Sequence, residues 1–365
     1  MQAKCKLTVN GREVQANAGE TLIDAALGAW LVIPHDCRSG QCETCRVTVV
    51  GGHVADHGTA QGRTVLACQA RVEGNAEILF DELPVPVKRA GTLTELNRLS
   101  PEIVEAVITV KDTLVYRPGQ YLRVKFAGFP AREYSPTCRL VGTTNAHELI
   151  FHIRLLPDGL VSSQLGKAIR AGHRVHAQGA FGTAYLREGV GPLVLVAGGT
   201  GWAPVWALAR AARETQRHRH LVVIAGSKDA ENLYMRPALD WLVEQGVRDV
   251  YATAETGAAP PFLPGRPSHY LPLLNMEDSV YVAGPLGLVD AVKHKARLAA
   301  ANCYADPFLP SAGASSLMDR FHRLIGRERE RPFRNAASPV RGTTSPTNMR
   351  PDKTADAPRT HTQTT

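Results

Sequence analysis

Four cysteines near the N-terminus have the spacing of an iron–sulfur centre. Cys37, Cys42 and Cys45 form a C-x4-C-x2-C pattern, and Cys68 follows further along the chain. Thiolates with this spacing hold a plant-type 2Fe–2S cluster. Gly40 stands inside the run, where the absence of a side chain lets the backbone approach the inorganic sulfurs. The pattern therefore predicts one cluster bound by these four thiolates, in a chain that moves electrons one at a time.

The same cysteines could instead bind zinc, form disulfides or be buried free thiols. A zinc site favours two paired C-x2-C units, and this chain has one such pair. The chain has seven cysteines, an odd number, and its first residues show no apolar segment of a signal peptide. A disulfide framework is therefore not expected. A zinc ion, or a set of buried and unreactive thiols, is the remaining alternative.

The elements that must position the cysteines follow the pattern of a small β-sheet crossed by one helix. Residues 4–9 alternate between apolar and polar as a strand does, and Asn10-Gly11 predicts a type I′ hairpin turn. A helix is expected from Thr21 to about Gly28. After the cluster loop, a strand at 47–50 is expected to end in a turn at Gly51-Gly52.

The rest of the chain divides into regions of different periodicity. Two prolines and several basic residues interrupt the pattern at 84–97, which indicates an interdomain linker. Short strands follow at regular spacing, as in an antiparallel barrel. Beyond Pro192, buried strands alternate with helices, as in a doubly wound α/β domain. The predicted organisation is a β-grasp 2Fe–2S domain at 1–83, the linker at 84–97, a β-barrel at 98–188, an α/β nucleotide-binding domain at 189–310 and a basic, disordered tail at 311–365.

Composition is that of an ordinary globular protein, with 44% apolar and 21% charged residues. The net charge of +8 is unevenly distributed. Residues 1–85 carry seven basic and ten acidic groups, 86–310 carry 25 and 19, and 311–365 carry ten and five. Opposite fields of this kind favour docking and steer acidic redox partners, although an ordinary mixed surface explains the same counts. We expect a cytoplasmic monomer that binds neither nucleic acid nor membrane.

Arg132-Glu133-Tyr134-Ser135 brings together three side chains that a flavin requires. An arginine can clamp a phosphate, a tyrosine can stack on a flat ring, and a serine can bond a ring nitrogen. Taken alone, the tetrapeptide also fits an ordinary barrel strand. Gly159, Val161 and Ser162 lie in a later turn that adds small groups and backbone N–H groups for a pyrophosphate.

Two glycine-containing loops are expected at the carboxyl edge of the α/β sheet, where ligands bind. Gly198-Gly199-Thr200-Gly201 joins an apolar strand to a helix, and a phosphate can lie on the N-terminus of that helix. Gly284 ends a later strand. A plain turn that packs a helix on a sheet is the alternative. At the next strand end, Lys228 could meet a 2′-phosphate and Asp229 would repel it, so we expect a relaxed preference for NADH.

In this order, the motifs resemble those of the reductase components of multicomponent aromatic-ring dioxygenases, of the naphthalene dioxygenase type. This group lies within the ferredoxin–NADP⁺ reductase superfamily. The resemblance spans residues 1 to about 310. It depends on the cysteine set together with Arg132–Ser135, His152-Ile153-Arg154, Gly182-Thr183-Ala184-Tyr185-Leu186, Gly198–Pro204 and Tyr304-Ala305-Asp306-Pro307-Phe308.

The resemblance implies FAD and NADH or NADPH as cofactors beside the cluster. It places Tyr134 and Ser135 at the reacting flavin ring, with Arg132 holding the flavin. It assigns the rest of FAD to His152, Ile153, Arg154, Gly159, Val161 and Ser162. It assigns the nicotinamide nucleotide to Gly198, Gly199, Thr200, Gly201 and Gly284, with Phe308 covering the flavin ring or guiding the nicotinamide.

Two positions depart from the family pattern. Ala283 stands where the family usually has a cysteine, which is expected to alter nicotinamide placement and lower turnover. Gly179-Ala180 stands where the family usually has Gly-Pro. The tail beyond Pro310 has no counterpart in the family.

The activity implied is that of a ferredoxin–NAD(P)⁺ reductase in aromatic hydrocarbon catabolism. Electrons from NAD(P)H pass through FAD and the cluster to a Rieske-type ferredoxin or a terminal oxygenase. Loop 38–44 is the expected exit, as the most exposed part of the cluster site. The alternatives are the reductase of a diiron monooxygenase, and an electron carrier or redox sensor that holds only the cluster. The aromatic substrate cannot be read from a subunit that never touches it.

Overall fold

The computed structural model describes residues 3–308 apart from Asp36, Cys42, Pro84 and Val141. The predicted tail at 311–365 lies outside the described residues. Cys42, one of the four predicted cluster ligands, lies outside them as well.

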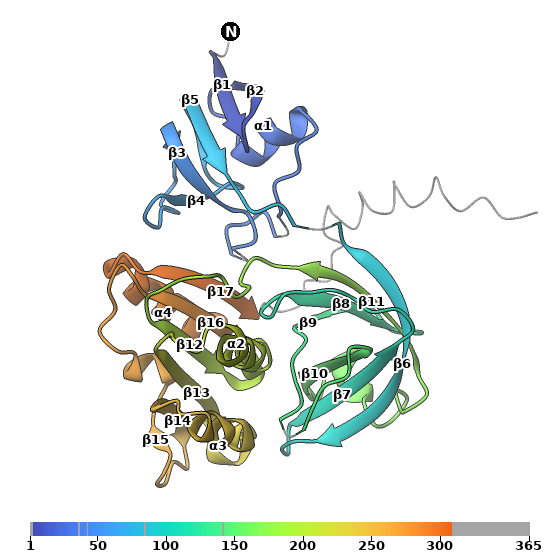
Figure 1. Ribbon diagram of the computed structural model, residues 1–365. Helices are drawn as coiled ribbons and strands as arrows, with labels where there is room; N and C mark the ends of the chain where they lie inside the picture. Colours follow the sequence, from blue (N-terminus) through green and yellow to red (C-terminus); the bar gives the residue numbers. More distant parts are fainter. Residues whose placement is uncertain (1–2, 36, 42, 84, 141, 309–365) are drawn as a thin grey trace, which may run out of the picture. The chain divides into compact units, whose positions relative to one another are not determined.

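The N-terminal region folds as a five-stranded sheet with one helix, in the strand order β2-β1-β5-β3-β4 (Figure 1). Strand β1 pairs in parallel with β5, and the other pairs are antiparallel. The helix packs Leu22 and Ile23 against Leu7 and Ile78 in a closed core. The elements are β1 Lys4–Val9, β2 Arg12–Asn17, α1 Leu22–Gly28, β3 Arg46–Ala55, β4 Thr64–Leu66 and β5 Arg71–Leu79.

Two of the glycine-based turn predictions for this domain had opposite outcomes. Asn10 and Gly11 both have positive φ, 47° and 77°, which confirms the type I′ turn. The turn expected at Gly51-Gly52 is wrong, because both residues lie inside β3. The register between β3 and β5 shifts at these glycines, so they form bulges in a continuing strand. Gly52 has φ +77°, and a Cβ there would lie 2.0 Å from the Asn75 carbonyl oxygen.

The second region is a six-stranded antiparallel sheet in the order β10-β7-β6-β11-β8-β9. A bridge between Thr137 and Ile150 links the β9 end back to β10 and closes the barrel. The core is filled by residues such as Phe126 and Phe151. The elements are β6 Val87–Arg98, β7 Ile103–Val110, β8 Tyr121–Phe126, β9 Arg132–Tyr134, β10 Glu148–Arg154, the 3-10 turn η1 Ser162–Gln164, and β11 Arg174–Phe181.

The linker predicted at 84–97 differs from the structure, in which β6 begins at Val87 and pairs with both β7 and β11. The sequence hid this strand because only Leu93 in it is fully buried, and a bulge beside that residue shifts the alternation. Without a clear alternation, the basic residues and Gly91 of this strand look like those of a loop that connects two domains.

The third region is a six-stranded parallel sheet in the order β15-β14-β13-β12-β16-β17. Helices α2 and α3 pack on one face of the sheet and α4 on the other, which confirms a doubly wound fold. The elements are β12 Leu193–Gly198, η2 Gly199–Gly201, α2 Trp202–Thr215, β13 Leu221–Asp229, η3 Ala230–Asn232, α3 Arg236–Glu244, β14 Asp249–Thr256, β15 Leu263–Pro264, η4 Pro267–Tyr270, β16 Ser279–Pro285, α4 Leu286–Leu298 and β17 Asn302–Phe308. Within the described ranges, no helix has the length and apolar character needed to span a bilayer.

Candidate functional site

The thiols of Cys45 and Cys37, two of the predicted cluster ligands, both act on the thiol of a third, Cys68. The pKa of the Cys68 thiol is lowered to about 6, chiefly by a hydrogen bond from Cys45 and also by Gln69 and the Gly40 backbone. The neighbouring Cys37 thiol and burial oppose this shift. Gln69 Nε2 lies 3.5 Å from Cys68 Sγ. Clustered sulfurs that receive N–H donors suit an iron–sulfur cluster, so the described ligands fit the group.

The cluster loop has a buried side and an exposed side. Glu43 and Thr44 are buried, at 5% and 6% exposure, while Ser39 and Gln41 are exposed. Loop 38–44 is predicted as the exit, as the most exposed part of the cluster site, and that expectation of exposure is wrong for Glu43 and Thr44. Packing against the rest of the chain, which the local sequence does not reveal, covers these two residues.

Glu43 makes the contacts that cover the loop. Its carboxylate pairs with Arg46 Nε at 2.6 Å and with Lys293 of α4. Burial raises the pKa of Glu43, but Arg46 and Lys293 lower it further, so the net shift is downward. The Thr183 hydroxyl approaches the Glu43 carbonyl oxygen at 3.5 Å. One loop residue thus contacts its own domain, the barrel segment and the α/β domain.

A second anchor lies where the first domain ends. Asp81 pairs with Arg187 at 3.0 Å and accepts a hydrogen bond from the Tyr185 hydroxyl. The Arg187 guanidinium also lies over the rings of Tyr185 and Tyr304, 4.2 and 4.1 Å from their centroids. Tyr281 of β16 donates to the Tyr185 carbonyl at 3.0 Å. The motif at 182–186 therefore links the three folded regions.

Ser135 meets an acidic residue from the far end of the chain. Its hydroxyl donates to Asp306 Oδ2 at 2.9 Å, which joins the end of β9 to β17. Burial raises the pKa of the Asp306 carboxyl to about 6, although the Ser135 hydrogen bond opposes the shift. Asp306 faces Ala283 in the β16–β17 register, one position before Gly284. A hydrogen-bonded serine–aspartate pair with a raised carboxyl pKa thus lies beside the second glycine loop.

The other residues of the flavin motif lie on the barrel side of this pair. The Tyr134 ring packs on Phe151, with centroids 6.0 Å apart, and burial raises its pKa to about 12. Arg132 donates to the neighbouring Ala131 carbonyl at 2.8 Å. Thr137, two residues beyond Ser135, is fully buried and its hydroxyl lacks a hydrogen-bond partner within the described residues. An unsatisfied buried hydroxyl costs stability, and a bound flavin is a group that could satisfy it.

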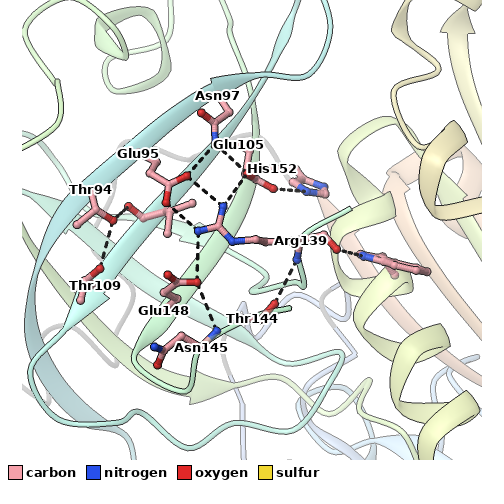
Figure 2. A network of polar contacts seen from close by, with 12 residues as sticks. Thr94, Glu95, Asn97, Glu105, Thr109, Arg139, Thr144, Asn145, Glu148 and His152 are labelled. Carbon is pink, nitrogen blue, oxygen red and sulfur yellow. Dashed lines mark hydrogen bonds and ion pairs between the residues drawn. The ribbon is translucent and has the colours of Figure 1, made fainter. Parts of the chain in front are cut away.

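His152, the first residue of the motif at 152–154, lies in a polar network with Glu105 and Arg139 (Figure 2). His152 is buried, with Nδ1 3.2 Å from the Tyr234 hydroxyl and Nε2 4.0 Å from Glu105. Burial lowers the His152 pKa to about 3, so the ring is neutral. In the same network Arg139 pairs with Glu95 at 2.8 Å. The structure therefore surrounds His152 with protein groups.

The remaining predicted FAD residues have structural surroundings of their own. Arg154 pairs with Glu102 at 2.6 Å. Ile153 and Val161 are buried in the barrel core, so only their backbones are available to a ligand. A Cβ on Gly159 would lie 2.2 Å from Ser162 Oγ, which explains the glycine in that turn.

The two glycine loops of the α/β domain touch each other. A Cβ on Gly201 would lie 2.1 Å from the Ala283 carbonyl oxygen, and one on Gly284 would lie 2.7 Å from the Gly198 carbonyl oxygen. The first turn of α2 carries no acidic side chain. A helix N-terminus reached through glycines, without competing carboxylates, is suited to a phosphate. The loop Gly198–Gly201 thus fits a nucleotide.

Family models match three segments of the chain. They are a 2Fe-2S iron-sulfur cluster binding domain at 7–73, an oxidoreductase FAD-binding domain at 90–185 and an oxidoreductase NAD-binding domain at 195–294. A curated relative from a Ralstonia species is 31% identical over 325 residues, covering 82% of this chain and 96% of that protein. It is the ferredoxin–NAD(P)⁺ reductase component of naphthalene 1,2-dioxygenase/salicylate 5-hydroxylase systems. The chain belongs to this family of iron–sulfur flavoprotein reductases.

Further comparisons agree with this assignment. The toluate 1,2-dioxygenase electron transfer component of Pseudomonas putida is 30% identical over 329 residues, covering 82% of this chain and 96% of that protein. A crystal structure of an Amycolatopsis cytochrome P450 reductase shares the fold, with a TM-score of 0.61 and 24% identity over 84% of this chain and all of that one. The reductase is an oxidoreductase whose cofactors are one 2Fe–2S cluster, FAD and NAD(P)H.

Two further residues of the reductase lie at strand ends. Lys228 is exposed at the end of β13, and the adjacent Asp229 caps the following turn by accepting from Asn232 N at 3.0 Å. Phe308 is 37% exposed and stands beside Pro285 in the β16–β17 register.

Sequence reasoning missed the importance of Asp306 and Glu43. Asp306 was only part of a motif, although a carboxylate after the apolar Ala305 at the end of a parallel strand was a usable signal. Glu43 was only a spacer between two cysteines. Their partners are 171 and 250 residues away along the chain, so local patterns could not have supplied them.

Proposed function

We propose that this reductase is the electron-transfer component of an aromatic-ring-hydroxylating dioxygenase. It takes electrons from NAD(P)H and passes them to a ferredoxin or to the oxygenase in aromatic hydrocarbon catabolism. The observation that carries the proposal is that a cysteine-rich loop, a flavin-type barrel and a nucleotide-type α/β domain occur in one chain. Relatives named for naphthalene, toluate and anthranilate dioxygenase systems support this partner class.

A second candidate partner is a monooxygenase. The xylene/toluene monooxygenase electron transfer component is 29% identical over 238 residues, and an alkene monooxygenase reductase is 28% identical over 306. The dioxygenase proposal is preferred because its relatives reach higher identity over comparable or longer segments. A Rieske-type ferredoxin is the acceptor we favour, in the cytoplasm, where thiolates stay reduced.

We assign the reacting region to the Ser135–Asp306 pair. The bound cofactors supply the redox chemistry, in which an electron pair arrives as a hydride and leaves as single electrons. Ser135 would bond the flavin at its reacting nitrogen, and Asp306, whose pKa is raised to about 6, could exchange a proton through the Ser135 hydroxyl. Tyr134 offers its ring face, and Arg132 its charge for a phosphate.

The remaining roles follow the same geometry. Gly198, Gly199, Thr200 and Gly201 would receive the nucleotide phosphates at the N-terminus of α2, and Gly284 would let the nicotinamide approach Asp306. Lys228 would meet a 2′-phosphate. Phe308 would shield the flavin ring. Cys37, Cys42, Cys45 and Cys68 would hold the cluster.

The test is NADH-dependent cytochrome c reduction by the purified protein, with and without Cys42→Ser. Flavin and cluster absorbance should both be present in the wild type and should both bleach with NADH. The variant should keep flavin bleaching and lose most of the one-electron output. Cluster absorbance without flavin would instead favour the electron-carrier alternative, and a colourless or zinc-containing protein would overturn the proposal.

A further inference from the structure

Trp30 is an exposed aromatic residue in an unfavourable backbone conformation. It follows α1, where Leu31 N bonds to Ala26 O and Trp30 N to Leu27 O. This is the Schellman arrangement, whose left-handed position is usually glycine and sometimes asparagine. Trp30 occupies that position with φ 62°, a conformation that bulky side chains rarely adopt. The fold itself would be served better by glycine.

The Trp30 side chain contributes little to the fold. It is 89% exposed and does not belong to the core of its domain. Within the described ranges it takes part in no ring-stacking or cation–π pair. Val32, two residues later, is 52% exposed. A strained conformation that presents a large apolar surface to solvent points to a role in recognition.

The segment that carries Trp30 leads directly into the cluster loop. Arg38 of that loop pairs with Asp24 of α1, which ties the loop to the helix that Trp30 ends. The side of the loop at Glu43 and Thr44 is buried, so a partner can approach only from the side where Ser39 and Gln41 are exposed. Trp30 and Val32 therefore lie on the exposed segment that precedes the cluster loop by a few residues.

We propose that Trp30 and Val32 form the docking surface for the protein that accepts electrons from the cluster. The occupant is a single-electron carrier protein with an apolar pocket for the indole ring and a basic rim around it. Tryptophan is favoured at the centre of interfaces because it buries a large rigid surface. The basic rim follows from the charge of the N-terminal domain alone and not from the net +8 of the chain, since residues 1–85 carry three more acidic than basic groups before the thiolates are counted. The inference rests on the proposed function.

The experiment compares the full-length holoprotein with Trp30→Gly, Trp30→Phe and a matched control, Leu273→Ala. Leu273 is fully exposed in the α/β domain, outside the docking surface. The acceptors are the ferredoxin of the Ralstonia naphthalene 1,2-dioxygenase/salicylate 5-hydroxylase system and, separately, ferricyanide. Ferricyanide needs no docking surface and reports on the NADH-driven chemistry alone.

For Trp30→Gly we expect at least a tenfold loss in kcat/KM for the ferredoxin, with ferricyanide reduction and thermal stability retained. Trp30→Phe should keep most of the rate, and Leu273→Ala all of it. Full ferredoxin activity in Trp30→Gly would overturn the proposal, as would an equal loss with ferricyanide or a wild type that cannot reduce the ferredoxin. Ferredoxin reduction should slow as salt is added, and acceleration by salt would contradict the basic rim. Failure of ferricyanide reduction in the wild type would instead count against the proposed function.

Discussion

The cluster loop and the Ser135–Asp306 pair are built in different ways. The cluster loop takes its first three ligands from nine consecutive residues, Cys37 to Cys45. The Ser135–Asp306 pair joins the end of β9 to β17, which lies beside β16 in the sheet. These residues come together only in the folded chain. A site whose residues lie in one short loop can be recognised from the sequence. A site whose residues lie at the ends of several strands cannot.

The difference also separates the effects that substitutions should have. A substitution at Ser135 or Asp306 should slow the entry of electrons from NADH, whichever acceptor is used. A change at the buried side of the cluster loop should slow only the steps that follow flavin reduction. The Ser135 and Glu43 substitutions test this separation between flavin reduction and the later electron-transfer steps.

The largest effect is expected for Ser135→Ala. Removing the hydroxyl takes away the hydrogen bond to Asp306 and the proposed contact with the reacting ring. The rate of flavin bleaching by NADH in stopped-flow measurements should fall by about 100-fold, the lower range for a positioned proton-transfer group. Ser163→Ala, in the same barrel, is the control. An unchanged bleaching rate in Ser135→Ala would remove the pair from the mechanism.

Glu43→Gln should slow electron transfer to the cluster and not flavin reduction. It removes the charge that lies between Arg46 and Lys293, and leaves two cations without their carboxylate. We expect cluster bleaching after NADH mixing to slow by about 10-fold, or about 1.4 kcal/mol, while flavin bleaching is retained. The exposed Glu77→Gln is the control. Equal slowing of flavin and cluster bleaching would break the proposed separation.

The pH dependence of stability should report on Asp306. Its pKa of about 6 lies above the ordinary 3.8, so the folded protein keeps a proton that the unfolded chain releases. This contribution is present below about pH 4 and is lost as pH rises through 6. From pH 5 to 7 the flavin-free protein should lose about 1 kcal/mol relative to Asp306→Asn. Unfolding of both proteins at the two pH values measures the difference, and parallel pH profiles would contradict the raised pKa.

The smallest effect is expected for Lys228→Ala. An exposed charge that meets a 2′-phosphate contributes up to about 1 kcal/mol. The kcat/KM for NADPH should therefore fall by about 5-fold, and that for NADH should not change. Steady-state assays with the two nucleotides give the ratio. An equal loss with both would mean that Lys228 does not read the 2′-phosphate.

Several features of the fold could be predicted because they depend on local patterns. The strand at 4–9, the Asn10-Gly11 turn and the helix after Thr21 follow from alternation, positive φ and capping, which neighbouring residues decide. The buried run at 193–196 was recognisable as a parallel strand for the same reason. The predictions failed at Gly51-Gly52 and at 87–97, where the partner strand decides between a bulge, a strand and a loop.

The sequence by itself predicted a ligand set for the cluster and determined the three-region order and the positions of the glycine loops, because each depends on spacing within a short segment. Only the tertiary structure decided that Ser135 forms a hydrogen-bonded pair with Asp306 and that Lys293 covers Glu43. It also decided which side of the cluster loop remains open to a partner. These contacts join residues more than 150 positions apart. Such pairs form only when the domains pack together, so the residues around either partner do not predict them.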